Sequence, residues 1–153
     1  MHNWIAPMLG IRAKINFWEG GAIKHGDLVA IDTETLLIDD ERPWLYPDVA
    51  VLTAYSGGDT VDLVEWGFIP AYINTLIEQK KQLVFHNAPF DMGVLGLRKF
   101  VPHIDKGLIW DTGLQWTLRR ISTDGMSDKQ REYPSLARVV RDLFKEDLDK
   151  DSS

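Results

Sequence analysis

Cysteine is absent from the sequence, which excludes disulfide bonds and thiolate metal sites. Long apolar runs are absent too, and none reaches the length of a membrane span. The first residues carry a short apolar patch but no long apolar core and no small-residue cleavage site, so a secretory signal is not expected. Together these absences predict an intracellular, cytoplasmic protein that does not enter a membrane.

Basic residues are in the minority. Lys and Arg number 17 against 23 Asp and Glu, which gives a formal net charge of −6 at pH 7. A module that binds nucleic acid mainly through charge is usually basic, so this balance argues against such a module. It argues less against a metal-dependent nuclease, because carboxylates are needed there to hold cations that reverse the local charge.

The pattern of apolar residues predicts a mixed α/β domain. A chain of 153 residues with 44% hydrophobic residues suits one globular domain. Apolar runs predict strands at 28–31, 49–55, 60–64, 82–86 and 108–110, and helical periodicity predicts helices at 70–81, 88–100, 112–121 and 135–145. Three strands followed by helix–strand alternation indicate a mixed five-stranded sheet flanked by helices.

We expect this domain to occupy residues 27–146, after an irregular lead-in at 1–26 and before an acidic tail at 147–153. Residues 122–133 are polar and are expected to form a loop. The apolar stripe of the second helix is expected to comprise Phe90, Val94, Leu97 and Phe100, and that of the last helix Leu136, Val139, Val140 and Leu143. Ligands of such sheets gather at the C-terminal ends of parallel strands, so the polar residues there are the candidates for a site.

Two acids close the first predicted strand, which ends in VAIDTET. Asp32 and Glu34 are two residues apart, so their side chains point to the same face of an extended strand. Two like charges there need a cation or strong hydrogen-bond donors to remain ionised together. For an isolated Asp-x-Glu, the simpler interpretation is a strand end that enters solvent, with Thr33 or Thr35 capping a turn.

A second polar cluster follows the fourth predicted strand, in LVFHNAPFDMGVL. Asn87 at the junction can cap the next helix, and Asp91 falls near the first turn, where the helix dipole favours an acid. Acids at a strand end and at the start of a later helix can also converge on one crevice. Asp32, Glu34 and Asp91 would then supply three oxygen donors, which suit Mg²⁺ or Mn²⁺ better than zinc.

These segments resemble motifs of the DEDD superfamily of 3′–5′ exonucleases, which includes the proofreading domains of DNA polymerases, ribonuclease D and ribonuclease T. VAIDTET resembles the first motif and VFHNAPFDMGVL the second. IWDTGLQWTLRR and YPSLARVVRDLF resemble further segments of the proofreading and ribonuclease D branches. The match spans about residues 28–146. It implies an RNase-H-like fold and hydrolysis of nucleic acid at single-stranded 3′ ends.

The resemblance also implies roles for the acids. The family splits phosphodiester bonds with two metal ions, Mg²⁺ or Mn²⁺. By resemblance, Asp32 bridges both ions, Glu34 binds the ion on the side of the nucleophile, and Asp91 helps to hold the other ion.

Substrate contacts are implied in the same way. The residues concerned are Thr33, Thr35, Asn87 and Phe90, of which Phe90 is expected to pack more than to touch the substrate. Among the aromatic residues, Trp44 lies in a polar predicted loop and is a candidate for stacking on a base. Trp110 and Trp116 lie in apolar, regular segments and are expected in the core.

One feature of the family is missing. A third motif, Tyr-x-x-x-Asp or His-x-x-x-Asp, supplies the fourth acid and the general base. The only Tyr-x-x-x-Asp spacing, from Tyr55 to Asp59, falls in a predicted hairpin turn before the second motif, and none of the four histidines has an Asp four residues later. The domain is therefore expected to be C-terminally incomplete: one chain of a split enzyme, the front of a longer one, or a degenerate scaffold. Apolar surface left exposed would favour a second chain or a homo-oligomer.

Two other functions remain open. A non-catalytic interaction module of the same fold, attached to a polymerase or a replication complex, would also lack the third motif. A different carboxylate hydrolase would need a further acid near Asp32, and Asp111 is the candidate, although capping of the helix that follows is its expected role. The acids Asp147, Asp149 and Asp151 are expected to form a solvated tail.

Overall fold

The structure is a computed structural model that describes residues 2–6, 11–125 and 132–145. It divides into two compact units, one up to Trp110 and one from Asp111 onwards, and each is described by itself. The expected acidic tail lies outside the described residues, as do residues 126–131 of the expected loop. Among the described residues, no helix is long and apolar enough to cross a membrane.

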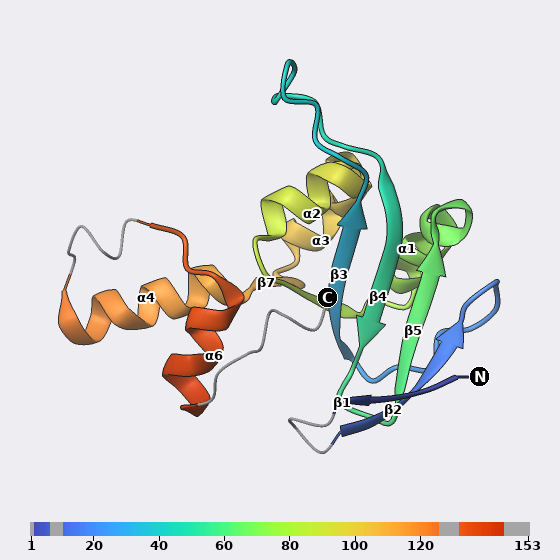
Figure 1. Cartoon of the computed structure of the whole chain (residues 1–153), viewed down its shortest axis with the longest axis horizontal. Helices are drawn as coiled ribbons and strands as arrows, with labels where there is room; N and C mark the ends of the chain where they lie inside the picture. Colours follow the sequence, from blue (N-terminus) through green and yellow to red (C-terminus); the bar gives the residue numbers. More distant parts are fainter. Residues whose placement is uncertain (1, 7–10, 126–131, 146–153) are drawn as a thin grey trace. The chain divides into compact units, whose positions relative to one another are not determined.

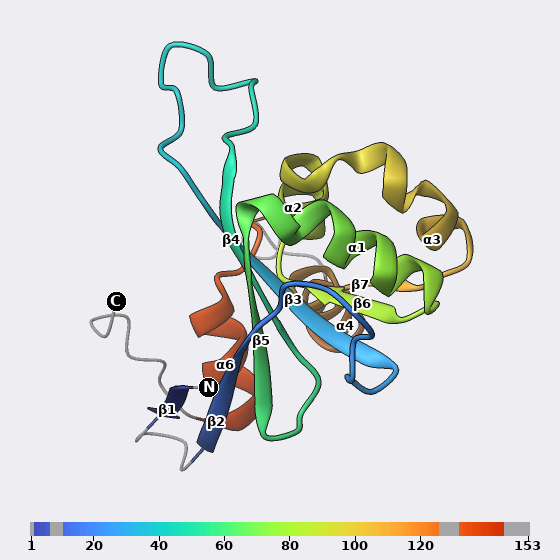
Figure 2. The ribbon, with the colours of Figure 1, turned by 90° about the vertical axis from the view of Figure 1, so that its right-hand side faces the viewer.

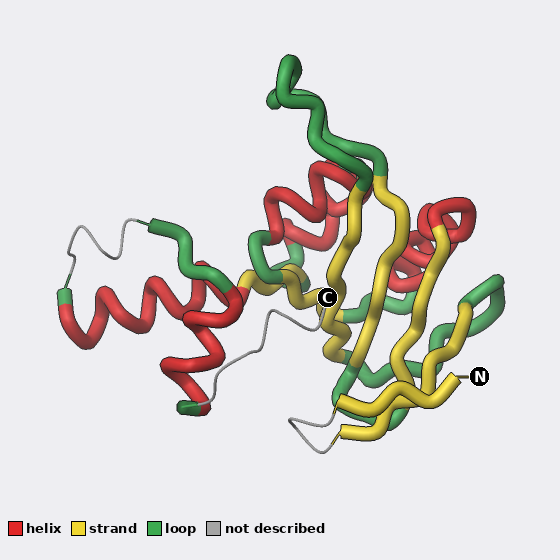
Figure 3. Tube along the Cα trace, in the orientation of Figure 1, coloured by secondary structure: helices red, strands yellow, loops and turns green. Residues whose placement is uncertain are grey.

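The first unit is built on a seven-stranded sheet with the strand order β1-β2-β5-β4-β3-β6-β7 (Figures 1 and 3). The strands are β1 His2–Ala6, β2 Ile11–Phe17, β3 Leu28–Thr35, β4 Val49–Tyr55, β5 Thr60–Glu65, β6 Gln82–Phe85 and β7 Ile109–Asp111. β4 pairs antiparallel with both β3 and β5, whereas β6 pairs with β3 in parallel. The five strands from β3 to β7 confirm the predicted mixed sheet.

Two additional strands correct the expected number of strands and the expected irregular lead-in. β1 pairs antiparallel with β2, and β2 pairs in parallel with β5, so the sheet extends past β5. The sequence of β2, IRAKINF, alternates between apolar and polar residues, which is typical of a strand. Pro7 and the glycines of the same region obscured this alternation.

Three helices lie together on one face of the sheet (Figures 1 and 2). They are α1 Ile69–Glu78, α2 Ala88–Leu95 and α3 Val101–Asp105. Residues of β3 alternate between exposed and buried, and its buried positions include Val29 and Ile31. The core also contains Tyr72, Phe85 and Phe100, none of them more than 1% exposed. The alternation of β3 therefore separates a core face from a face that carries its acids.

The second predicted helix differs from expectation in length and in buried face. α2 ends at Leu95, because Gly96 has a φ of 98°, and a 3₁₀ turn and α3 follow. The buried positions of α2 are Ala88, Asp91, Met92 and Leu95 rather than the predicted stripe. Apolar residues surround this helix on nearly all sides, so spacing alone did not identify the side that meets the sheet. The difference matters because it places Asp91 on the buried side.

The second unit contains α4, Thr112–Asp124, and α6, Leu136–Phe144. Trp116 is 4% exposed, as predicted, and the guanidinium of Arg138 lies 4.8 Å from the centre of its ring. Val139 of the predicted stripe is buried, but Leu136 and Leu143 are exposed. They border a groove of about 380 Å³ between the two helices. The unit therefore presents apolar surface beside its small core.

Candidate active site

The end of β3 carries acids on one face and a threonine on the other. Asp32 and Glu34 are both exposed, and the intervening Thr33 is buried. This confirms that the two acids share a face of the strand. The structure thus places two carboxylates side by side where β3 leaves the sheet.

Asp91 approaches this strand end from α2. It lies in the first turn of the helix and is 5% exposed. The hydroxyl of Thr33 donates a hydrogen bond of 2.5 Å to Oδ1 of Asp91. Thr33 therefore directs its hydroxyl to the third acid. One residue of the first motif thereby ties β3 to the second motif.

The three carboxylates influence one another electrostatically. Burial and the charge of Asp32 raise the pKa of Asp91 to about 6, although the hydrogen bond from Thr33 acts to lower it. Burial and the charge of Glu34 likewise raise the pKa of Asp32, against a lowering by the Thr33 backbone and by His86. Asp32 thus lies within electrostatic reach of both other acids. A cation would relieve this repulsion.

The carboxylate oxygens of the three acids are of the chemical type that binds a hard divalent cation. Carboxylate oxygens are the ligands that Mg²⁺ and Mn²⁺ prefer, and the mutual repulsion of Asp32 and Asp91 gives a cation a reason to bind. Within the described part of the chain, however, no three His, Cys, Asp or Glu side chains are gathered closely enough to hold an ion by themselves. Any ion here needs ligands in addition to these side chains, and Mg²⁺ commonly takes them from water and substrate phosphate.

His86 is a neighbour of the acids that sequence reasoning missed. β3 and β6 run parallel with Ala30 opposite Val84, so continuation of the register brings His86 beside Asp32. Its charge acts to lower the pKa of Asp32, which confirms that the two are close. The LVFHN segment carried the signal, since a histidine directly after a parallel strand lies at the end where sites form.

Asn87 and Phe90 occupy the turn between β6 and the body of α2. Asn87 is the N-cap residue, but its backbone is left-handed, with φ 67° and ψ 57°, and its side chain makes no capping hydrogen bond. The expected capping role is therefore wrong. Phe90 is half-buried and meets the ring of Tyr46 edge to face at 6.3 Å. It packs, as predicted, and its partner comes from the long loop between β3 and β4.

That loop, residues 36–48, projects beyond the ends of β3 and β4 (Figure 3). Its base is closed by a hydrogen bond from the Leu36 N–H to the Asp48 carbonyl. Its return limb is held on α2, because the ring of Tyr46 fills the space that a Cβ at Gly93 would need. Leu37 and Trp44 are 97% and 72% exposed. Large apolar side chains thus stand free next to the strand end that carries the acids.

Two further predictions concern residues away from the three acids. Asp111 caps α4 as expected, because its Oδ1 accepts hydrogen bonds from the N–H groups of Gly113 and Leu114. It also accepts one from the hydroxyl of Tyr133. Trp110, expected in the core, is 39% exposed, and its indole N–H donates to Gln82. The indole hydrogen bond explains how it remains at the sheet edge.

Replacing Thr33 by Val is expected to weaken binding of Mn²⁺ by about 10–100-fold, the usual effect of losing a group that orients a metal ligand. Val has the shape of Thr but cannot donate to Asp91, whose pKa should then rise above about 6. Calorimetric titration with Mn²⁺ measures the change. Thr35→Val is the matched control, and equal affinity of Thr33→Val and wild-type protein would contradict the orienting role.

Known structures resemble this chain over most of its length. A structure of Brucella melitensis NrnC bound to pGG is 22% identical, with a TM-score of 0.59 over 92% of this chain and 66% of that chain. NrnC from the same organism with bound Mg²⁺ is 20% identical, with a TM-score of 0.56 over 89% of this chain and 62% of that chain. A structure described as the apo form of the nuclease is 22% identical, with a TM-score of 0.55, and the match covers 85% of this chain and 58% of that chain. The likeness confirms the expected RNase-H-like mixed α/β fold.

The chain spans 58% to 66% of the length of these three structures. No family model matches the sequence, and no curated protein matches it either.

Proposed function

We propose that this protein is a metal-dependent 3′–5′ exonuclease that hydrolyses phosphodiester bonds at single-stranded nucleic-acid ends. The observation that carries the proposal is the meeting of both motifs at the end of β3. Thr33 binds Asp91 directly, and the charge of Asp32 raises the pKa of Asp91. The fold shared with NrnC, a protein whose structures contain Mg²⁺ and pGG, supports the proposal.

Asp32, Glu34 and Asp91 are the proposed metal ligands. Bound Mg²⁺ or Mn²⁺ supplies positive charge to the phosphate and makes water a better nucleophile. Asp32 has neighbours on both sides and is the residue best placed to serve two ions, with Glu34 and Asp91 each serving one. Thr33 positions Asp91, and His86 offers a second polar group beside Asp32.

The proposed substrate is a short oligonucleotide with a free 3′ end. Thr35, Asn87 and Phe90 are the proposed substrate contacts near the strand end. Trp44 stands on the adjacent loop with 72% of its surface exposed, and exposed aromatic rings stack on bases without regard to sequence. The net charge of −6 disfavours binding of a long polymer mainly through charge, which favours a small substrate that is held through its metal-bound end.

Full activity is proposed to need a further segment or a second chain that supplies the fourth acid and the general base. Among the described residues, no group of three acids or histidines is close enough to hold an ion without further ligands. The chain covers 58% to 66% of the three similar structures, so each of them contains residues that this chain does not match.

The direct test is cleavage of a 5′-fluorescent oligonucleotide and of pGG, with Mg²⁺ or Mn²⁺ and with EDTA. We expect slow, metal-dependent shortening from the 3′ end, and at least about 100-fold less with Asp32→Asn, because a metal site contributes several kcal/mol to the reaction. Asp111→Asn is the control, since Asp111 is assigned to the cap of α4.

If cleavage persists in Asp32→Asn but is lost in Asp111→Asn, the result would contradict the role of Asp32 as a metal ligand and favour the alternative carboxylate hydrolase. Oligonucleotide binding without any metal-dependent cleavage, even with an added third motif, would favour the non-catalytic module.

A further inference from the structure

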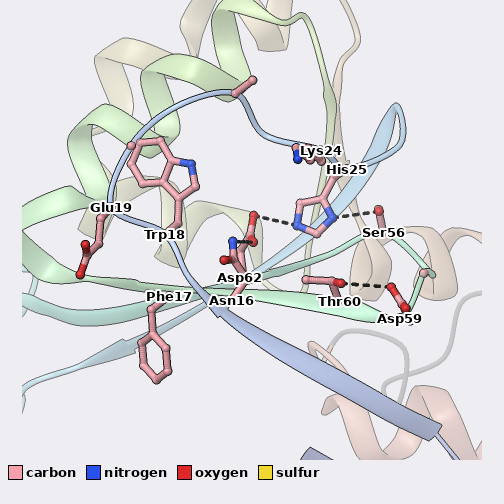
Figure 4. Close-up of a pocket in the computed structure, with 13 residues that line it drawn as sticks. Asn16, Phe17, Trp18, Glu19, Lys24, His25, Ser56, Asp59, Thr60 and Asp62 are labelled. Atoms are coloured by element: carbon pink, nitrogen blue, oxygen red, sulfur yellow. Dashed lines mark hydrogen bonds and ion pairs between the residues drawn. The ribbon is translucent and has the colours of Figure 1, made fainter. Parts of the chain in front are cut away.

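A cavity of about 390 Å³ lies away from the acids of β3, next to the turn between β4 and β5 (Figure 4). Its lining includes Asn16, Trp18, His25, Ser56 and Asp62. The proposed nuclease uses none of these residues. They come from β2, from the segment that leads into β3, from the turn, and from β5. Two stretches of the chain that are distant in sequence, residues 16–25 and 56–62, thus place polar side chains around one space.

Asp62 is the anchor of this cluster and is 4% exposed. Its Oδ1 accepts a hydrogen bond of 2.7 Å from Asn16, and its Oδ2 accepts one of 2.7 Å from the hydroxyl of Tyr72. Burial by itself would raise the pKa of this carboxyl, but contacts with His25, Asn16 and Tyr72 outweigh burial and hold the pKa below its usual value. Asp62 is therefore a buried carboxylate that stays ionised.

His25 connects this carboxylate to a serine. Its Nε2 lies 3.0 Å from Oδ2 of Asp62, and its Nδ1 lies 3.0 Å from Oγ of Ser56. The contact with Asp62 is short, but it does not have the geometry of a hydrogen bond. Such contacts commonly tighten only when substrate is bound.

A backbone group also contacts the hydroxyl of Ser56. The N–H of Gly26 donates to Oγ of Ser56 at 3.2 Å, which leaves the Ser56 hydrogen free to point to Nδ1 of His25. When Ser56 donates in this way, the imidazole proton lies on Nε2, facing Asp62. This tautomer is the one a serine nucleophile requires: base nitrogen toward the hydroxyl, N–H toward the carboxylate.

We propose that Ser56 is an activated nucleophile, with His25 as its base and Asp62 as the group that orients His25, and that the cavity is a second hydrolytic site for small carboxylic esters. Ser56 is half-buried at the start of a tight turn, where Gly57 has a φ of 86°, so its hydroxyl lies at the edge of the cavity. Small esters fit a space of about 390 Å³. An alkoxide also departs with less proton assistance than the amine of an amide does, which favours esters over peptides as substrates.

The reaction needs only water besides the ester. Oγ of Ser56 bonds to the carbonyl carbon while its proton passes to Nδ1 of His25. The ester C–O bond then breaks, and the same proton passes to the departing alkoxide. In the second half, the oxygen of water bonds to the acyl carbon and one water proton passes to His25. The bond between the acyl carbon and Oγ then breaks, and the same proton passes to Oγ, which releases the carboxylic acid and the free serine.

The test is labelling of the full 153-residue chain with a fluorophosphonate probe. In this reaction, Oγ of Ser56 bonds to the phosphorus atom of the probe and fluoride leaves. We expect one label, located at Ser56 by peptide mass spectrometry and lost when the chain is unfolded in urea. Hydrolysis of p-nitrophenyl acetate is expected to fall at least about 100-fold in Ser56→Ala and in His25→Gln, as general-base help is worth 10²–10⁴-fold.

Ser122→Ala, at an exposed serine of α4, is the matched control and is expected to label normally. Ser56→Ala is also expected to keep its metal-dependent cleavage of oligonucleotides, which shows that it folds and separates the two sites. Because labelling of the wild-type chain requires no variant, an unlabelled Ser56 in the folded protein overturns the proposal. Labelling at Ser56 that persists in His25→Gln overturns the role of His25.

Discussion

Adding a helix that carries Tyr-x-x-x-Asp or His-x-x-x-Asp is expected to raise the metal-dependent exonuclease activity of this chain by about 10²–10⁴-fold, the usual contribution of general acid–base help. The end of β3 explains the deficit. It provides Asp32, Glu34 and the nearby Asp91, but the described residues include no group of three that holds an ion without further ligands. A fourth acid would both complete the ligand set and position the base.

The second unit exposes apolar surface of its own. The groove of about 380 Å³ between α4 and α6 is bordered by Trp116, Val139 and Leu143. Leu136 and Phe144 are 47% and 66% exposed beside it. Exposed apolar side chains gathered on one helix pair are typical of an interaction surface.

The experiment compares the 153-residue chain with the same chain carrying the added helix, either fused to its C-terminus or supplied as a second chain. The substrate is a 5′-labelled oligonucleotide with Mg²⁺. The matched control is the same added helix with its Asp changed to Asn, which keeps the packing and removes the ligand. Equal, Asp32-dependent activity with and without the helix, from a stable monomer, would contradict the incompleteness of the site.

The sequence predicted the five strands from β3 to β7 because each is a short apolar run bounded by turn residues. β4 was predicted with its observed bounds, since the Gly-Gly turn after Ser56 fixes where the hairpin reverses. β1 and β2 were missed because they follow one another across a glycine-containing segment and belong to the sheet only through pairing with β5. The pairing of β2 with β5 joins segments that are distant in sequence, so the local pattern of apolar residues does not predict it.

For the candidate site too, the sequence predicted the features that depend on local geometry and missed those that depend on packing and strand register. That Asp32 and Glu34 share a face follows from strand geometry alone. That Thr33 reaches Asp91 depends on how α2 packs, and α2 is apolar on so many sides that its spacing indicated the wrong face. The proximity of His86 to Asp32 depends on the register between β3 and β6. In the cluster of His25, Ser56 and Asp62, His25 lies 31 positions before Ser56, so the cluster left no local motif in the sequence.

Replacing Asp91 by Asn is expected to stabilise the metal-free protein at pH 7.5 while it removes exonuclease activity. Asn has the size of Asp, and its carbonyl can still accept the hydrogen bond from Thr33. It lacks the charge that burial and Asp32 disfavour. The pKa of Asp91 is raised from 3.8 to about 6, which corresponds to roughly 3 kcal/mol as an upper limit.

The pH dependence follows from the direction of that shift. A raised pKa means that the folded state holds the proton more tightly than the unfolded state does. The contribution of Asp91 to stability is therefore full below about pH 4 and is lost as the pH rises through about 6. Wild-type and Asp91→Asn proteins should be nearly equal in stability at pH 4. They should diverge between pH 4 and 6, with the variant more stable at pH 7.5.

Urea denaturation in EDTA across this pH range measures the difference, and the stability of each protein with Mn²⁺ added separates electrostatic strain from ion binding. An ion that binds only the folded state stabilises it in proportion to ln(1 + [L]/Kd). Mn²⁺ should therefore stabilise the wild-type protein more than the variant and reduce the gap. Thr35→Val, which changes no charge, should follow the wild-type curve at every pH. A variant less stable than wild type at pH 7.5 without metal would show that the Asp91 carboxylate is held by favourable contacts. The same result would remove the electrostatic reason for placing a cation at the end of β3.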